Sequence, residues 1–429
     1  MKRINSNSIW NGIFHMGIGT VLAQLINIVA QPILTRLFSA ETLGIYTYIV
    51  SLATIVIPIA SLKLDMLIVS ETDEDEAQYI TDASMIINVL ISLVYLAVIT
   101  IGYSISSDNI FNKYGLVIYL VPVLVFTNGL RFLFISYNNR YKKYKLISGV
   151  AIMREGVRAI IQIGAGFFSL GAVSLSMGYA LSPLFGLRWQ TKYYLSQLQK
   201  RSRLTWGKFK EVVIVKGKEQ ILYLVPAQFI NSFSSSLITI SITALFSATD
   251  LGYYSVGARI LNIPIIFITS NVSKVCYQKI SENIAQKKPV YNLLMSVVMV
   301  LSLCSAFGFS VLFLIAPWIS ELIFGNGYAV AGVYIRCLCV MYAVRFVATS
   351  FAGVFTAFRK QRFELVINIL LIVAAALAYA IGTVKGLSIT TYLWLLGWAY
   401  TIVYVIMLAG YIICCKKYDL SLMGSVKKI

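Results

Sequence analysis

Apolar stretches follow one another along most of this chain, and each is close to the roughly 20 residues that a helix needs to cross a bilayer. Hydrophobic residues make up 59% of the sequence and charged residues 12%, whereas a soluble domain has about 45–50% and about 25%. The pattern predicts an all-α integral membrane protein with twelve transmembrane helices. The predicted spans are 14–36, 43–64, 80–103, 115–137, 147–169, 171–188, 220–244, 252–274, 291–314, 330–356, 364–382 and 388–413.

A short internal repeat divides these spans into two halves. The ten residues 37–46 (LFSAETLGIY) return at 245–254 (LFSATDLGYY), 208 residues later and with seven identities. Six spans separate the two copies, so both halves enter the membrane in the same direction. This indicates a parallel repeat of two pseudo-symmetric six-helix bundles, a plan that many transporters share.

The basic residues predict the orientation. With the N-terminus inside, the inner loops and tails hold 27 of the 36 Lys and Arg residues and the outer loops hold three, which places both termini in the cytoplasm. Nine of the 27 lie in 188–218. We therefore predict an N-terminal lobe over 1–188, a basic cytoplasmic linker over 189–219 and a C-terminal lobe over 220–429. The net charge of +19 is explained by contact with anionic phospholipids and does not indicate nucleic acid.

Polar residues form one stripe along the first span of each half. Amides and hydroxyls at i, i+4, i+7 and i+11 share a helix face, and adding 208 gives four more polar residues on span seven. We favour the lining of a substrate cavity over hydrogen bonds between helices, which remain the alternative. The eight residues are Thr20, Gln24, Asn27, Gln31, Gln228, Ser232, Ser235 and Thr239.

Six arginines fall inside predicted spans, where a central charge costs about 2.5–3.5 kcal/mol even on the lenient insertion scale. They are Arg131, Arg154, Arg158, Arg259, Arg336 and Arg345. For Arg131, Arg154, Arg158 and Arg345 we favour a cationic cavity over structural ion pairs. The other two lie nearer the outer ends, where snorkelling is a strong alternative. Guanidinium groups suit phosphate or carboxylate, so the expected substrate is anionic.

Glu155 is the one clear acidic residue beside these arginines. It is our candidate for a coupling site that exchanges a proton or a sodium ion, and a local salt bridge to an arginine is an equally good interpretation. The six cysteines lie in or beside apolar runs without a histidine cluster. We expect no metal and no cofactor apart from an ion gradient.

Three groups of segments together resemble one family. They are Thr35–Phe38 with Leu43–Tyr46 and Pro58, then 251–264 (LGYYSVGARILNIP), then 316–325 (APWISELIFG) followed by 329–331. Their order and spacing resemble the Wzx-type O-antigen flippases, in the polysaccharide transporter branch of the MOP superfamily. The resemblance covers nearly the whole chain.

The resemblance implies a V-shaped fold of twelve helices in two lobes, in a bacterial cytoplasmic membrane. It implies translocation of a polyprenyl-diphosphate-linked oligosaccharide from the inner to the outer leaflet, by alternating access through a central cavity. An ion gradient of H⁺ or Na⁺ would drive it, and other polysaccharide assembly proteins would be its partners. The protein would thus be a secondary transporter and not an enzyme.

Two other functions stay open at this point. A multidrug exporter of the same superfamily is the nearest, although cationic drugs would be repelled by a cavity of six arginines. A membrane-embedded polysaccharide polymerase or ligase is the other. It would need a sizeable outer loop for its chemistry, and no outer loop between the predicted spans exceeds about 15 residues.

Overall fold

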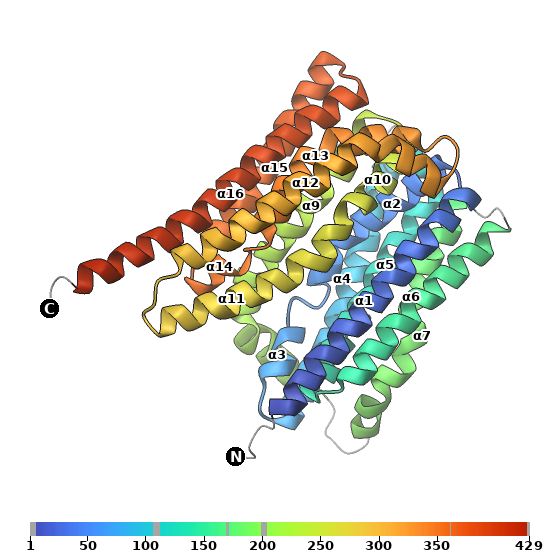
Figure 1. The fold of residues 1–429 in the computed structure, drawn as a ribbon. Helices are drawn as coiled ribbons and strands as arrows, with labels where there is room; N and C mark the ends of the chain where they lie inside the picture. Colours follow the sequence, from blue (N-terminus) through green and yellow to red (C-terminus); the bar gives the residue numbers. More distant parts are fainter. Residues whose placement is uncertain (1–5, 106–111, 169–170, 199–203, 361, 427–429) are drawn as a thin grey trace. The chain divides into compact units, whose positions relative to one another are not determined.

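The structure is a computed structural model that describes residues 6–105, 112–168, 171–198, 204–360 and 362–426 (Figure 1). The described residues form helices joined by short turns and contain no strand. The all-α prediction is confirmed. Helices are the natural choice for such an apolar chain, because they satisfy every backbone polar group internally within a bilayer.

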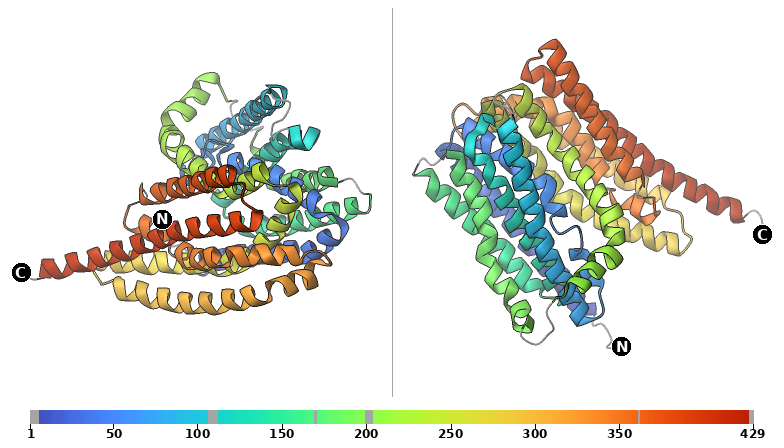
Figure 2. Two further views of the ribbon diagram at one scale, coloured as in Figure 1. Left: turned by 90° about the horizontal axis from the view of Figure 1, so that it is seen from above. Right: turned by 180° about the vertical axis from the view of Figure 1, so that it is seen from behind.

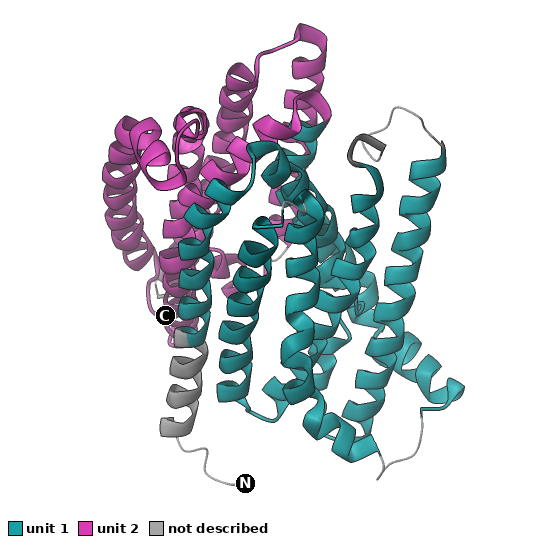
Figure 3. Ribbon diagram, turned by 90° about the vertical axis from the view of Figure 1, so that its right-hand side faces the viewer, with its two compact units in different colours: residues 1–243 teal, residues 244–429 magenta. Residues whose placement is uncertain are grey.

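The chain divides into two compact units, residues 1–243 and 244–429 (Figure 3). Unit 1 contains two short π-helices before α9, at Glu211–Lys216 and Gln220–Leu224. Its α-helices are α1 (Ser6–Leu37), α2 (Ala40–Val56), α3 (Asp65–Ser70), α4 (Glu74–Ile105), α5 (Leu120–Arg140), α6 (Tyr144–Gly166), α7 (Gly171–Leu198), α8 (Trp206–Lys210) and α9 (Val225–Leu245).

Unit 2 contains the remaining helices. They are α10 (Ala248–Pro264), α11 (Ser270–Ala285), α12 (Tyr291–Phe324), α13 (Ala329–Thr349), α14 (Gly353–Ala357), α15 (Arg362–Lys385) and α16 (Ile389–Val426). With 38 residues, α16 is the longest helix described, and its C-terminal end projects past the other helices of its unit (Figure 2).

Ten segments in the described part of the chain are long and apolar enough to cross a membrane. The two other predicted spans are present as α6 and α7, which have 23 and 28 residues. Their charged side chains lower their hydropathy, and α6 carries Arg154, Glu155 and Arg158 in its middle. The protein is therefore a multi-pass membrane protein, and one of these two less apolar helices, α6, holds three of the predicted site residues.

The two repeat copies fold alike. Ser39 begins α2 and its side chain accepts a hydrogen bond from the Thr42 amide. Ser247 begins α10 in the same way, and with Asp250 it completes a capping box. A serine side chain at this position satisfies an amide that the first turn of a helix leaves unpaired. The repeat therefore encodes the start of the second helix in each half.

The boundary between the units differs from the predicted one. The sequence placed it in the linker before residue 220, whereas the compact units divide after residue 243 and leave most of α9 with unit 1. One contact that holds α9 there is the hydrogen bond from Ser236 Oγ to the Ser51 carbonyl of α2, at 3.3 Å. Residues 199–203 of the predicted linker lie outside the described residues.

Each unit has a helix that contacts three equivalent neighbours. α5 contacts α2, α4 and α7, and α13 contacts α10, α12 and α16, which occupy the same places in the order of the repeat. Figure 1 also shows α1 running alongside α6. α5 and α13 carry Arg131 and Arg345, so each unit has one arginine on the equivalent helix.

Candidate functional site

In unit 1, three of the predicted arginines and Glu155 form one cluster, which we call the α6 cluster. Arg158 Nη1 lies 3.1 Å from Glu155 Oε2, and Arg154 Nη2 pairs with the other carboxylate oxygen, Oε1. The side chains of Arg154, Glu155 and Arg158 are 17%, 7% and 13% exposed. The salt bridge that was the alternative interpretation of Glu155 is thus present, to Arg158 and also to Arg154. A cavity around these arginines and a coupling role for Glu155 stay predictions.

Arg131 of α5 is the third arginine of the α6 cluster. Its guanidinium interacts electrostatically with Arg154, Glu155 and Arg158, and it stacks on the ring of Phe132 at 4.1 Å. Its buried Nε has no hydrogen-bond partner in the described part of the chain. Three guanidinium groups against one carboxylate leave this cluster with an excess of two positive charges.

Two tyrosines complete the α6 cluster and were not predicted. The ring of Tyr179 on α7 lies 5.4 Å from the Arg158 guanidinium, and the buried Tyr46 of α2 also interacts with Arg158. Gly178 allows this arrangement, because a Cβ at that position would lie 2.7 Å from Cγ of Gln162 on α6. Small residues let membrane helices approach closely. The sequence contained one signal for such a tyrosine, because Tyr46 is the last residue of the first copy of the repeat.

Unit 2 has a simpler site around Arg345 of α13, which we call the Arg345 box. Its guanidinium lies 5.4 Å from the ring of Tyr342. Three more buried tyrosines interact with its charge: Tyr254 of α10 and Tyr400 and Tyr404 of α16. No ion pair to Arg345 occurs among the residues that the structure describes, and its Nε has no hydrogen-bond partner there.

Two glycines bring the helices of the Arg345 box together. A Cβ on Gly257 of α10 would lie 3.1 Å from the carbonyl oxygen of Ala331 on α13. A Cβ on Gly397 of α16 would lie 3.0 Å from the carbonyl oxygen of Cys337, also on α13. Tyr254 of α10 and Tyr400 of α16 each stand three residues from one of these glycines, so the close approach places their rings beside Arg345.

Arg336 has a local structural role. Pro317 within α12 has no amide hydrogen to give to the carbonyl of Phe313, one turn earlier. Arg336 supplies the missing donor: its Nε bonds to the Phe313 carbonyl and its Nη2 to the Leu314 carbonyl, both at 2.8 Å. Gly332 makes room, because a Cβ there would lie 2.3 Å from Cα of Pro317. Contact of Arg336 with a substrate stays a prediction.

The remaining predicted residues lie on α10, α1 and α9. Arg259 is half-buried on α10, five residues after Tyr254, and its place in a cavity stays a prediction. On α1, Thr20 is exposed, Gln24 and Asn27 are half-buried, and Gln31 is buried with no hydrogen-bond partner for its amide among the described residues.

The second polar stripe lies on α9. Gln228 donates to Ser232 at 3.3 Å, and Ser235 donates to the Asn231 carbonyl at 2.7 Å. Ser232 and Thr239 are buried and Ser235 is exposed. Gln228 and Ser235 thus bond within their own helix. These bonds do not decide between a cavity lining and contacts between helices.

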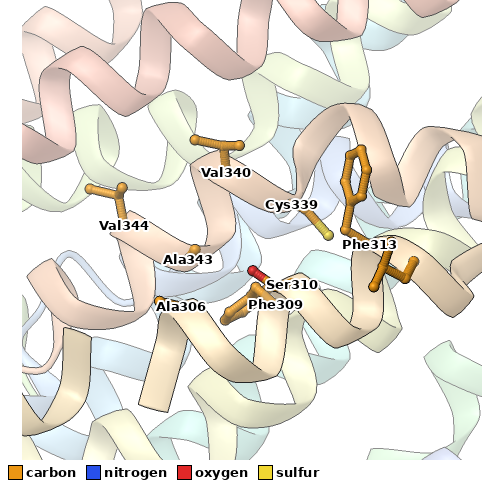
Figure 4. A pocket seen from close by; sticks show the side chains of 9 residues that line it. Ala306, Phe309, Ser310, Phe313, Cys339, Val340, Ala343 and Val344 are labelled. Atoms are coloured by element: carbon orange, nitrogen blue, oxygen red, sulfur yellow. The ribbon is translucent and has the colours of Figure 1, made fainter. Parts of the chain in front are cut away.

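An apolar hollow of about 400 Å³ lies between α12 and α13 (Figure 4). Phe309, Phe313, Val340 and Val344 dominate its lining, and Ser310 supplies its hydroxyl. This hollow contains none of the predicted site residues. In the described part of the chain, no group of three or more His, Cys, Asp or Glu residues is placed to hold a metal ion.

Outside the helices that span the membrane, an ion-pair network joins the turn before α4 to the segment before α9. Lys216 Nζ lies 3.2 Å from Glu71 and 2.7 Å from Glu76, and Lys208 Nζ lies 2.6 Å from Glu76 and 3.0 Å from Glu211. We call these five residues the loop network. Arg140 at the end of α5 donates to the carbonyls of Ile68, Glu71 and Asp73 beside it.

The loop network shifts the protonation of its members. Burial raises the pKa of Glu71, but hydrogen bonds from the Asp73 amide and from Lys216 outweigh it, and the pKa lies below its ordinary value. Burial lowers the pKa of Lys216, but its bonds to Glu76 and Glu71 outweigh that and raise the pKa. Bonds to Glu76 and Glu211 raise the pKa of Lys208.

A comparison of the sequence with family models identifies residues 33–331 as a polysaccharide biosynthesis protein. The chain belongs to this family. The match covers more than half of the sequence, and it includes the α6 cluster and the repeat. A comparison with curated proteins gives no match.

Solved structures show the same fold in transporters. A multidrug-resistance MATE transporter of the MOP superfamily, facing inward, superposes with a TM-score of 0.66 at 15% identity, over 94% of this chain and 96% of the other. The lipid II flippase MurJ, in an inward closed conformation, gives 0.73 at 11% identity, over 95% and 90%.

A third structure with this fold is a MOP-superfamily transporter from Pyrococcus furiosus, described as having a binding pocket of reverse polarity that suggests a different function. It gives a TM-score of 0.59 at 14% identity, over 96% of both chains. The predicted membership of a polysaccharide family is thereby confirmed, and the predicted fold is that of solved MOP-superfamily transporters. The fold is one that solved transporters and a flippase have.

Proposed function

We propose that this protein is a flippase for a polyprenyl-diphosphate-linked oligosaccharide, such as an O-antigen or capsule repeat unit. It moves this lipid from the inner to the outer leaflet of a bacterial cytoplasmic membrane, with both of its own termini in the cytoplasm. The family supports the class of substrate, and the fold supports transport. The observation that carries the proposal is the excess of buried positive charge on membrane helices.

Positive charge in a membrane span is costly unless an anion compensates it. The α6 cluster has two positive charges more than its single carboxylate neutralises, and the Arg345 box has one arginine among tyrosines. A diphosphate that links a lipid to a sugar carries one negative charge on each phosphate group. Guanidinium groups bind such oxygens through two parallel hydrogen bonds. The charge and geometry therefore match the substrate.

The sugar and the hydrocarbon tail of the substrate also have suitable surroundings. The amides and hydroxyls on α1 and α9 suit sugar hydroxyls, and the hydrocarbon tail stays in the bilayer. An inward gradient of H⁺ or Na⁺ drives alternating access, with Glu155 as the coupling candidate. Anionic phospholipids bind the basic loops, and other polysaccharide assembly proteins receive the product.

The multidrug exporter is the second candidate, because MATE transporters share the fold. The same arginines argue against it. Like charges in a low-dielectric site repel strongly, so a cationic drug would meet an unfavourable field at both arginine sites.

Deletion of the gene in its host tests the proposal. A flippase predicts loss of long surface polysaccharide and accumulation of lipid-linked oligosaccharide on the cytoplasmic face. Accumulation of single units on the outer face would indicate a polymerase or ligase partner instead. Unchanged polysaccharide with altered drug tolerance would favour the exporter.

A further inference from the structure

Glu155 occupies the position that a bound anion would take in the α6 cluster. Its two carboxylate oxygens each face a different arginine, with Oε2 3.1 Å from Arg158 Nη1 and Oε1 against Arg154 Nη2. One phosphate group presents two oxygens to two guanidinium groups in the same way. Glu155 is also the most deeply buried of the three side chains, at 7% exposed.

We infer that Glu155 is a resident counter-anion that masks Arg154 and Arg158 until a phosphate of the substrate displaces it. This inference rests on the proposed function, since it needs an anionic substrate at the α6 cluster. It adds a specific role for Glu155: a positioning residue that lowers the affinity of the site for phosphate.

The sequence spacing explains why Glu155 acts in this way. It is three residues before Arg158, a spacing at which side chains of one helix can pair, and it is adjacent to Arg154, so one segment of α6 holds the carboxylate and both guanidinium groups. An empty site therefore keeps its two arginines paired, which avoids the penalty of isolated buried charges. A substrate must compete with a tethered anion, and a transporter benefits because its cargo also has to leave.

The displaced carboxylate has another partner within the cluster. Arg131 interacts electrostatically with Glu155, and its Nε has no hydrogen-bond partner among the described residues. When phosphate takes Arg154 and Arg158, Glu155 can pair with Arg131. The three positive charges of the arginines then balance two negative charges on the diphosphate and one on Glu155, and the cluster becomes neutral.

The size of the effect follows from competition. If Glu155 holds the arginines in about nine of ten molecules, the apparent dissociation constant is about tenfold higher than that of the unmasked site. Glu155→Gln removes the competing charge and keeps the shape of the side chain. We expect this variant to bind diphosphate about tenfold more tightly than the unchanged protein.

The experiment is calorimetric titration of the full-length protein in detergent with farnesyl diphosphate. Glu41→Gln is the matched control, because it removes one carboxylate at an exposed position in the first turn of α2. Its affinity should stay unchanged. Glu155→Asp is a second variant: its shorter side chain keeps the charge but cannot span both arginines equally, so a smaller gain is expected.

The outcomes separate the two proposals. Equal or weaker binding by folded Glu155→Gln, with normal binding by the unchanged protein, overturns the masking role alone. Absence of binding in every protein tested overturns the proposed function and the masking role with it. If Glu155→Gln unfolds in detergent, thermal melts with and without farnesyl diphosphate test the masking role instead. Rescue by the ligand supports masking, and an unshifted melt together with unchanged affinity of Glu155→Asp contradicts it.

Discussion

The α6 cluster and the Arg345 box stand on equivalent helices but differ in chemistry. Arg131 and Arg345 lie on α5 and α13, and Tyr46 and Tyr254 lie on α2 and α10. Each unit adds tyrosine from one further helix, α7 in unit 1 and α16 in unit 2. The difference comes from one helix pair: α6 carries Arg154, Glu155 and Arg158, whereas the corresponding stretch of α15 is apolar.

This difference separates the structural features that the two units share from those in which they differ. The helix contacts and the helix starts are shared, because they depend on glycines, caps and apolar faces. The charges differ beyond Arg131 and Arg345, because only α6 adds Arg154, Glu155 and Arg158. One unit therefore has a partly compensated group of charges, with two positive charges in excess, and the other has a single arginine in an aromatic box.

The largest effect is expected when both units lose their equivalent arginine. Arg131→Gln with Arg345→Gln should abolish export of surface polysaccharide, because each site loses its central cation. Membrane insertion should be intact. Polysaccharide blots of a deletion strain that carries the variant, with immunoblots of the membrane fraction, measure both. Lys385→Gln, at the exposed end of α15, is the control.

Placing a carboxylate in the Arg345 box should make it resemble the α6 cluster. Tyr404→Glu puts an acid beside Arg345, and a masked arginine should bind diphosphate about tenfold more weakly. Tyr404→Phe keeps the ring and should have little effect. Calorimetric titration with farnesyl diphosphate measures the affinities. Equal affinity of the Glu and Phe variants would show that Arg345 does not contact the phosphate.

Arg336 should matter for stability more than for transport. Arg336→Gln removes two charge-assisted hydrogen bonds and leaves the Phe313 carbonyl without a donor, which should cost about 2 kcal/mol of unfolding free energy. Pro317→Ala restores the amide hydrogen to α12. In the double variant the cost of losing Arg336 should be smaller. Additive costs in a double-mutant cycle of unfolding would refute this explanation of Arg336.

The smallest effect concerns the loop network and pH. Glu71 has a lowered pKa, so its contribution is present above its ordinary value of 4.5 and is lost as pH falls through the lower folded value. Lys216 has a raised pKa, so its contribution is present below 10.5 and is lost as pH rises through the higher folded value. Hydrogen exchange of residues 206–219 should thus be slowest between these limits.

The expected size of this effect is modest, about 0.2–1 kcal/mol, because water still reaches every pair, each side chain of the loop network being 19–45% exposed. Lys216→Gln should remove most of the protection from hydrogen exchange at neutral pH. In this variant the protection should no longer decrease at high pH. Exchange in 206–219 that does not change with Lys216→Gln would show that other contacts hold this segment.

Much of the fold could be predicted from the sequence, because apolar length and the repeat are local signals. They gave the helices, the two related halves and the equivalence of Arg131 with Arg345. Helical spacing also placed Arg154 and Arg158 on one face, with Glu155 three residues before Arg158. The compact units divide after residue 243 and not in the predicted linker, and a contact such as that from Ser236 to Ser51 joins residues too far apart in the chain for local signals to indicate it.

The tyrosines around the arginines were missed for a related reason. Periodicity tells which residues share a face of one helix, but it does not tell which other helix packs against that face. Tyr179 reaches Arg158 because Gly178 lets α7 approach α6, and Arg336 reaches Phe313 because Gly332 lets α13 approach Pro317. The tyrosine that ends each repeat was a usable signal, since Tyr46 and Tyr254 both lie beside an arginine.

The central claim is that the buried arginines carry a lipid-linked diphosphate across the membrane. It is tested most directly in vesicles that contain purified protein and lipid-linked oligosaccharide from the host, with sugar accessibility measured from outside. The account predicts that the unchanged protein exchanges the lipid between leaflets and that the variant with Arg131→Gln and Arg345→Gln does not. Equal exchange by both proteins would contradict it.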